Sequence, residues 1–458
     1  MDGSSRKRAY VETYGCQMNI SDGELMEGIL EAEGYEIVDT PEEADVVLVN
    51  TCAIRERAEQ RVLGRVSQLT GLKRERPDMV IGVTGCMAQR MGKTLLEQAP
   101  DVDLVMGPDG YRSLPERLAA LEGRRSWTPS AKRRGPQLAV LDLDLGENYE
   151  GLEQRRTSGI SAWLPIQRGC DHRCTFCIVP YVRGPEKNRD PAEILREVGD
   201  ITASGVTQVT LLGQTVNSYS AAGWDFPRLL RAVARTPGIR RVRFQSPHPN
   251  DVTPELVEVM RSEPAVCDHL HLPAQSGNSR VLKRMLRRYT VESYLEKVEM
   301  VREAIPDIAV STDIIVAFPG ETPEEFEDTL DLMRTVRFDD AFTYKYSPRD
   351  GTPATRMPAE DFIAPDEAQA RLERLIEVSR EIQAEITASE VGRVVEVLVE
   401  KEARTHGQLL GRTEGNKVVA FPAEPVLIGT YQTVRLVATT SATFVGELAG
   451  DAALVESA

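Results

Sequence analysis

The chain has 458 residues, of which 41% are hydrophobic and 28% charged, a composition typical of a folded protein with two to four domains. Its formal charge of −16 argues against broad, nonspecific binding to nucleic acids, because neutralising phosphates needs Lys and Arg, which only local patches of this chain can supply. No apolar run approaches the roughly 18 residues of a membrane span. The first eight residues do not resemble a signal peptide, so we expect a cytoplasmic protein with no membrane contact.

The N-terminal part of the chain alternates between Val-rich apolar runs and helical patterns. The apolar runs predict three buried strands, at residues 9–14, 45–50 and 80–84. Two stretches have the apolar spacing of helices, at residues 21–32 and 55–69. Because strands and helices alternate, we expect a parallel α/β sheet, in a first domain at residues 8–124.

Polar and charged sequence follows, interrupted by the strand-like stretch LAVLDLDL, and predicts a linker at residues 125–155. Six strand–helix units come next, with strands that begin near Trp163, Thr207, Arg240, Val266, Ile308 and Asp340. Six units are fewer than the eight of a closed barrel, so we expect a partial (β/α) barrel at residues 156–389. The short alternating strands VVEVLVE, GQLLGRTE, KVVAFP and TYQTVRLVATT then predict a small antiparallel barrel at residues 390–454.

Three cysteines stand close together directly after the first strand of the predicted partial barrel, in RGCDHRCTFC. Cys170, Cys174 and Cys177 can hold three irons of a 4Fe-4S cluster, which leaves the fourth iron open to another ligand. S-adenosylmethionine bound there can accept an electron and release a 5′-deoxyadenosyl radical. The alternative is a structural zinc site completed by His172 or Cys267, but the spacing lacks the paired ligands and closed set of four that such sites use.

Cys16, Cys52 and Cys86 each follow one of the three N-terminal strands. Because the carboxyl ends of parallel strands lie at one edge of a sheet, these cysteines are predicted to form a second three-thiolate cluster site. Two of them are preceded by Gly, which allows a close approach of the backbone. The alternative is three separate cysteines that are buried as small apolar side chains.

Other chemically active side chains carry weaker signals. Cys267 lies in an apolar strand and is predicted to be a core residue. His248, His269 and His271 either line the mouth of the partial barrel or are buried and hydrogen-bonded, and both readings stay open. Two groups of basic residues are predicted as solvated faces, with contact to nucleic acid as the alternative: Arg280, Lys283, Arg284, Arg287 and Arg288, and Arg240, Arg241 and Arg243.

Together these motifs resemble the methylthiotransferase family of radical S-adenosylmethionine enzymes, across nearly the whole chain. The matching pieces are TYGCQMN, VLVNTCAIRERAE, VTGCMAQR, QRGCDHRCTFCIVPYVRG, LLGQTVNSY, LHLPAQSGN, LRRYT, FPGET and SPRDGTPA. The resemblance implies an N-terminal domain with an auxiliary cluster, a radical S-adenosylmethionine partial barrel and a C-terminal TRAM domain that binds RNA. Within the TRAM domain, Lys401, Arg404, Arg412 and Lys417 are the candidate RNA contacts.

The resemblance also implies the reaction. One S-adenosylmethionine methylates a sulfur on the auxiliary 4Fe-4S cluster, and a second is cleaved at the cluster of the catalytic cysteines of the partial barrel. The radical then allows a methylthio group to be installed at C2 of an adenine. Phe176 is expected to pack on the cofactor adenine, and Gln214 and Asp313 to contact the cofactor. Expected partners are tRNA and a low-potential electron donor such as flavodoxin or ferredoxin. The chain is expected to be a monomer, and its sulfur donor is not implied.

GCQMN and NTCAIRERAE are similar to the branch of the family that acts on N6-isopentenyladenosine of tRNA. The alternatives within the family are threonylcarbamoyladenosine of tRNA and an aspartate of a ribosomal protein. An electron-transfer or RNA-binding protein without radical chemistry is the alternative outside it. The sequence departs from the family at Ala317, where Gly is usual, and at residues 246–249, where SPHP replaces TSHP. Neither departure involves a cluster ligand.

Overall fold

The computed structural model describes residues 6–53, 56–122, 137–156, 159–440 and 442–450. The first part of the predicted linker, residues 125–136, lies outside the described residues. The same holds for Ile54 and Arg55 of the NTCAIRERAE motif and for residues 451–454 of the predicted C-terminal barrel.

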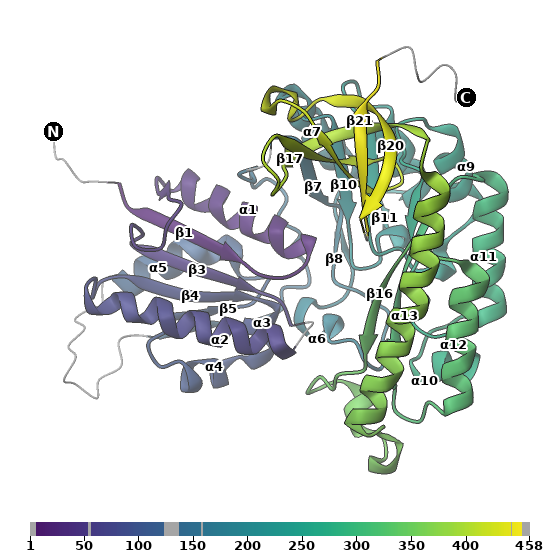
Figure 1. Ribbon diagram of the computed structural model, residues 1–458. Helices are drawn as coiled ribbons and strands as arrows, with labels where there is room; N and C mark the ends of the chain where they lie inside the picture. The colour runs from purple at the N-terminus through teal and green to yellow at the C-terminus, as the bar shows by residue number, and fades with distance from the viewer. Residues whose placement is uncertain (1–5, 54–55, 123–136, 157–158, 441, 451–458) are drawn as a thin grey trace.

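Six parallel strands form the sheet of the N-terminal domain, in the order β2-β1-β3-β4-β5-β6 (Figure 1). Its elements are β1 (Arg8–Thr13), α1 (Gln17–Ala32), β2 (Glu36–Ile37), β3 (Val46–Thr51), α2 (Glu56–Gly71), β4 (Val80–Gly85), α3 (Cys86–Met91), α4 (Lys93–Gln98), β5 (Leu104–Met106), α5 (Leu114–Glu122) and β6 (Leu138–Val140). Apolar residues cover both faces of β3 and β4, because α1 and α5 pack on one face of the sheet and α2, α3 and α4 on the other. The predicted parallel α/β sheet is confirmed, and the LAVLDLDL stretch supplies its edge strand β6.

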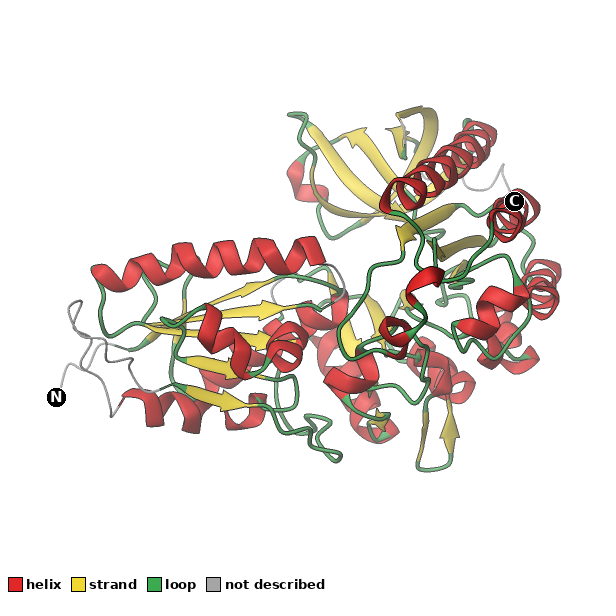
Figure 2. Cartoon of the chain, turned by 90° about the horizontal axis from the view of Figure 1, so that it is seen from below, coloured by secondary structure: helices red, strands yellow, loops and turns green. Residues whose placement is uncertain are grey.

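The central domain contains six parallel strands in two sheets, β13-β10-β7 and β14-β15-β16, which a single bridge between Val242 and Val266 joins. Its strands are β7 (Ser161–Pro165), β8 (Gln167–Arg168), β9 (Lys187–Asn188), β10 (Gln208–Leu212), β11 (Ser220–Ala221), β12 (Trp224–Asp225), β13 (Arg241–Phe244), β14 (His269–His271), β15 (Ala309–Val316) and β16 (Asp340–Lys345). Its helices are α6 (Val179–Arg183), α7 (Pro191–Ala203), α8 (Phe226–Ala234), α9 (Pro254–Ser262), α10 (Ser279–Arg284), α11 (Val291–Ala304), α12 (Pro323–Val336) and α13 (Pro365–Glu390). The predicted partial barrel of six units is confirmed. In Figure 2 the strands of the N-terminal sheet point toward it.

The C-terminal segment forms a closed barrel in the order β17-β18-β19-β21-β20. Its strands are β17 (Val394–Glu402), β18 (Gln408–Thr413), β19 (Val418–Pro422), β20 (Tyr431–Thr440) and β21 (Thr443–Leu448). The small barrel is confirmed, although β21 was absent from the predicted strands. This strand closes the barrel by pairing with both β19 and β20, and its Phe444 is buried in the barrel core with Val397 and Phe421.

Two arginines of β13 attach the C-terminal barrel to the central domain. Arg241 and Arg243 are only 4% and 8% exposed. Arg241 donates hydrogen bonds to the carbonyl oxygens of Arg412 and Glu396, and Arg243 donates to two carbonyls of the turn after β18. The prediction of a solvated face is therefore wrong for Arg241 and Arg243, because their buried guanidinium groups donate to carbonyls of the docked barrel.

Among the described helices, none combines the length and the apolar character that crossing a membrane requires.

Candidate active site

Cys16, Cys52 and Cys86 lie at the carboxyl ends of three neighbouring strands. Cys16 follows β1 as the N-cap of α1, Cys52 follows β3, and Cys86 follows β4 as the first residue of α3. Since β1, β3 and β4 are adjacent and parallel, the three loops meet at one edge of the sheet.

Two glycines allow these loops to approach each other. Gly15 has a φ of +128°, and a Cβ atom there would lie 2.4 Å from the Cβ atom of Cys52. Gly85 has a φ of +90°, and a Cβ atom there would lie 2.5 Å from the carbonyl oxygen of Thr51. Any larger residue would therefore push the cysteine loops apart as well as strain the backbone.

Cys170, Cys174 and Cys177 lie on the loop after β7 and β8. The Cys170 amide donates to the carbonyl of Gly184 at 3.1 Å, and the Cys177 amide donates to the carbonyl of Cys174 at 3.0 Å. Cys170 Sγ also lies 3.2 Å from Thr215 Oγ1. Backbone hydrogen bonds thus fix the loop at both its ends.

All nine site residues predicted from the sequence line one cavity. It lies between the edge of the N-terminal sheet and the mouth of the partial barrel, with a volume of about 300 Å³. The nine residues are Cys16, Cys52, Cys86, Cys170, Cys174, Cys177, Phe176, Gln214 and Asp313. Two cysteine sets that are more than 80 residues apart in the sequence therefore face a common space.

The spacing of the sulfur atoms fits clusters better than single ions. Among the described residues, neither set of three cysteines has its Sγ atoms all within 4.8 Å of one another, and all seven cysteines are free thiols. One tetrahedral zinc, with Zn–S bonds of about 2.3 Å, would draw its sulfurs to about 3.8 Å from one another. In an iron–sulfur cluster each thiolate binds a different iron, so the sulfurs stand farther apart. The residues present therefore fit two clusters.

The thiols differ in how easily they lose a proton. Burial raises the pKa of Cys170 and of Cys86, and it raises the pKa of Cys177 to about 12. A hydrogen bond with Cys52 lowers the pKa of Cys16 to about 6. Thiols that burial keeps protonated become thiolates when a metal replaces the proton.

Polar and aromatic side chains line the cavity beside the cysteines, among them Gln214, Gln275, Asp313 and Phe176. Gln214 and Gln275 each have a buried side-chain oxygen with no hydrogen-bond partner among the described residues. Gln275 has a φ of +69° and had not been predicted as a site residue. Asp313 Oδ2 lies 3.3 Å from His271 Nε2, from which it can accept a hydrogen bond. Phe176 is half-buried, with its ring edge-on to Phe318.

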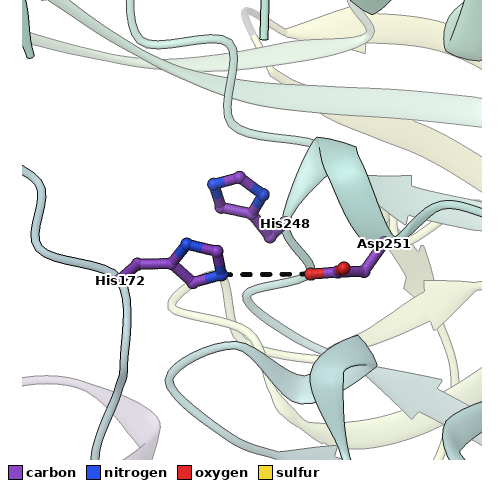
Figure 3. Close-up of side chains that lie close together, drawn as sticks. All are labelled: His172, His248 and Asp251. Carbon is purple, nitrogen blue, oxygen red and sulfur yellow. Dashed lines mark ion pairs between the residues drawn. The ribbon is translucent and has the colours of Figure 1, made fainter. Parts of the chain in front are cut away.

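On and near the loop of Cys170, Cys174 and Cys177, the rings of His172 and His248 stack in parallel, 4.0 Å apart at an angle of 6°, with Asp251 beside them (Figure 3). Ring nitrogens bind a metal in the plane of the ring, and two stacked planes cannot both contain one ion. His248 Nδ1 also accepts a hydrogen bond from the Asn250 amide. Burial lowers the pKa of His248 to about 2 and lowers that of His172. The stack therefore connects the loop of Cys170 with the loop after β13, and among the described residues His172 is not grouped with the cysteines as a zinc ligand.

The other histidines and Cys267 take different positions. His271 Nδ1 and His269 Nε2 both lie within 3.1 Å of Ser311 Oγ. Burial lowers the pKa of His269 well below its usual value. His271 contacts Asp313, which lines the cavity. His269 is instead a partly buried, hydrogen-bonded residue. Cys267 is 2% exposed and does not line the cavity, so its prediction as a core residue is confirmed.

Several basic side chains that were predicted on solvated faces form ion pairs. Arg280 pairs with Glu325, and Arg284 pairs with Asp361 at 2.6 Å. Among the candidate RNA contacts, Lys417 pairs with Asp339 at 2.7 Å and with Glu390, and Arg412 lies 3.4 Å from Glu400. Lys401 and Arg404 remain exposed.

Comparison with protein families gives three matches. Residues 164–333 match the radical SAM superfamily, and residues 388–449 match the TRAM domain. Residues 8–107 match a family described as uncharacterized protein family UPF0004. Each match covers one of the three folded units described above.

Curated relatives are similar over nearly the whole chain. A tRNA-2-methylthio-N(6)-dimethylallyladenosine synthase of Thermoanaerobacter sp. (strain X514) is 44% identical over 96% of this chain and 92% of its own length. The protein of the same name from Chlorobium limicola is 42% identical over 97% of this chain and 98% of its own length.

Solved structures share the fold at low sequence identity. The radical S-adenosylmethionine methyltransferase TsrM of Kitasatospora setae is 17% identical, with a TM-score of 0.57 over 81% of this chain and 91% of that chain. The cobalamin-dependent S-adenosylmethionine radical enzyme OxsB is 13% identical, with a TM-score of 0.53 over 81% of this chain and 56% of that chain. At these identities the likeness concerns the fold alone.

Proposed function

Because the chain belongs to the family of tRNA-2-methylthio-N(6)-dimethylallyladenosine synthases, we propose that it installs a methylthio group at C2 of N6-isopentenyladenosine at position 37 of tRNA, next to the anticodon. The product is 2-methylthio-N6-isopentenyladenosine. The observation that carries this proposal is the single cavity lined by six cysteines from two domains. A radical source and a sulfur source can then act on the same adenine.

In this proposal Cys170, Cys174 and Cys177 hold the radical-generating 4Fe-4S cluster, and Cys16, Cys52 and Cys86 hold an auxiliary 4Fe-4S cluster. When bound, the first cluster and S-adenosylmethionine supply a 5′-deoxyadenosyl radical, and the auxiliary cluster supplies the sulfur. Both assignments are supported by the position of the two sets, because all six cysteines line the same cavity.

The chain's own side chains orient the reactants. Gln214 and Gln275 line the cavity, and their side-chain oxygens have no hydrogen-bond partner in the described part of the chain, so they can accept hydrogen bonds from the cofactor or from the substrate base. Asp313 presents a carboxylate to the same space, and Phe176 offers an aromatic surface on which an adenine can stack. The apolar side chains of Ile178 and Val182 close one side of the cavity and exclude water from the radical.

The proposal includes the partners of the reaction. Lys401 and Arg404 on the C-terminal barrel are exposed and can contact tRNA phosphates. A low-potential electron donor such as flavodoxin or ferredoxin supplies the electron. We also propose that the chain acts as a monomer in the cytoplasm, where tRNA is modified.

Mass spectrometry of tRNA nucleosides from a deletion strain tests the proposed substrate. We expect 2-methylthio-N6-isopentenyladenosine to disappear and N6-isopentenyladenosine to accumulate. The wild-type gene and Cys267→Ala restore the product, whereas Cys170→Ala does not, because Cys267 lies outside the cavity. An unchanged level of the product contradicts the proposal. Loss of the methylthio derivative of threonylcarbamoyladenosine instead would reassign the substrate.

A further inference from the structure

Arg183, the last residue of α6, reaches from the central domain to a cysteine of the N-terminal domain. Its Nε donates a hydrogen bond to Cys86 Sγ at 3.1 Å. Its Nη2 donates to Asp22 Oδ2 at 2.7 Å and to Asn19 Oδ1 at 3.2 Å. The side chain is 4% exposed, so these are its contacts in a nearly dry environment.

Asp22 of α1 is shared by two arginines. Its second oxygen accepts a hydrogen bond from Arg168 Nη1 at 2.7 Å, and the Asp22 side chain is fully buried. Arg168 and Arg183 stand on either side of the loop that carries Cys170, Cys174 and Cys177. One carboxylate therefore ties both flanks of that loop to the N-terminal domain.

This buried group carries an excess positive charge. Two guanidinium groups face one carboxylate, and although burial opposes ionisation, the two arginines lower the pKa of Asp22. A buried charge without a counter-charge is strongly unfavourable in a protein interior. The Nε atom of Arg183 donates its hydrogen bond to the sulfur of Cys86. The Cys86 sulfur is thus the group that this excess positive charge faces.

The radical-generating set has a similar contact. Arg287 Nη1 donates to Cys174 Sγ at 3.4 Å, and Arg287 Nε donates to Tyr289 Oη at 3.0 Å. Tyr289 is itself fixed by the carbonyls of Pro273 and Ala274. In the described part of the chain, each cysteine set thus receives a guanidinium hydrogen bond on at least one of its sulfurs.

We propose that Arg183 and Arg287 are positioning residues, each of which tunes the reduction potential of the cluster whose thiolate it contacts, and that Arg183 also fixes the auxiliary cluster against the radical-generating one through Asp22. The inference rests on the proposed cluster sites. Hydrogen bonds to sulfur and nearby positive charge both favour the reduced state of an iron–sulfur cluster. Each proposed cluster therefore has a contacting arginine that raises its reduction potential.

Redox titration followed by electron paramagnetic resonance tests this inference one cluster at a time. The variant with Cys170, Cys174 and Cys177 changed to Ala retains only the auxiliary cluster, and the Cys16, Cys52 and Cys86 triple Ala variant retains only the other. In the first background, Arg183→Gln is expected to lower the potential, and Arg287→Gln to leave it unchanged. In the second background, Arg287→Gln is expected to lower the potential and Arg183→Gln to leave it unchanged.

Arg183→Gln leaves Asp22 paired with Arg168, so the buried charges balance and folding is expected. Arg183→Lys keeps the charge but loses the Nε donor, and it is expected to lower the auxiliary potential by less than Arg183→Gln. If Arg183→Gln instead loses iron from the auxiliary site alone, the positioning role is supported. Unchanged potentials with full iron content, or equal shifts of both clusters, overturn the inference. If the wild-type chain makes no methylthiolated tRNA, the proposed function fails instead.

Discussion

Replacing Gly15 with Ala is expected to remove the auxiliary cluster while leaving the fold intact. A Cβ atom there would lie 2.4 Å from Cys52 Cβ, whereas carbon atoms in contact stand about 3.5–4.0 Å apart, so Cys52 must move by more than about 1 Å. Metal ligands tolerate displacements of about 0.2 Å. The positive φ adds backbone strain of about 1–3 kcal/mol.

Gly34→Ala is the matched control. Gly34 also has a positive φ, of +87°, but a Cβ atom there would meet nothing within 4 Å. Both variants thus carry backbone strain, and only Gly15→Ala displaces a cysteine. After reconstitution, iron and sulfide are counted per chain. We expect Gly15→Ala to lose about half of the iron, given one cluster per three cysteines, and Gly34→Ala to keep all of it. Full iron in Gly15→Ala would refute the reasoning.

Three further predictions follow from buried residues. Cys86→Ala is expected to lose about half of the iron and Cys267→Ala none, because only Cys86 lines the cavity; equal losses would contradict the site. Arg243→Ala removes two hydrogen bonds to carbonyls of the C-terminal barrel and should cost about 3–6 kcal/mol in urea denaturation, whereas Arg334→Ala, on an exposed helix face, should cost little. An unfolded His248 takes up a proton near pH 6.5, about its ordinary pKa, but burial keeps its folded pKa at about 2. The unfolded state therefore binds more protons between these values, so stability of the metal-free chain should fall as pH drops below 6.5, about the unfolded pKa. The fall should be smaller in His248→Phe, and an identical pH dependence would show that His248 does not contribute.

The sequence predicted the parts of the site that depend on strand order. Cys16, Cys52 and Cys86 follow apolar runs, and strands of one parallel sheet end at one edge, so their convergence could be predicted. The loop of Cys170 was recognisable from spacing alone. Strand β21 was missed, although it forms a tight hairpin with β20 in which Thr440 pairs with Thr443. Only its pairing with β19 joins residues that are distant in the sequence.

Charged residues were the least predictable feature. A run such as RRVRF carries no sign that Arg241 and Arg243 are buried, because the carbonyls that they bind belong to a barrel more than 150 residues later. Arg183 and Arg287 lie in the motifs VPYVRG and LRRYT, which marked their segments as important. Which cysteine each would contact depends on how two domains dock, and local sequence does not encode that arrangement.

The most direct test of the central claim is a single assay that measures 5′-deoxyadenosine and methylthiolated tRNA together. Reconstituted protein is mixed with S-adenosylmethionine, a strong reductant and tRNA that contains N6-isopentenyladenosine. We predict that the wild-type chain makes both products, and that the variant with Cys16, Cys52 and Cys86 changed to Ala makes 5′-deoxyadenosine alone. Methylthiolated tRNA from that triple variant would contradict the role of the N-terminal cysteines in supplying sulfur. No 5′-deoxyadenosine from the wild-type chain would contradict the role of the other three cysteines in generating the radical.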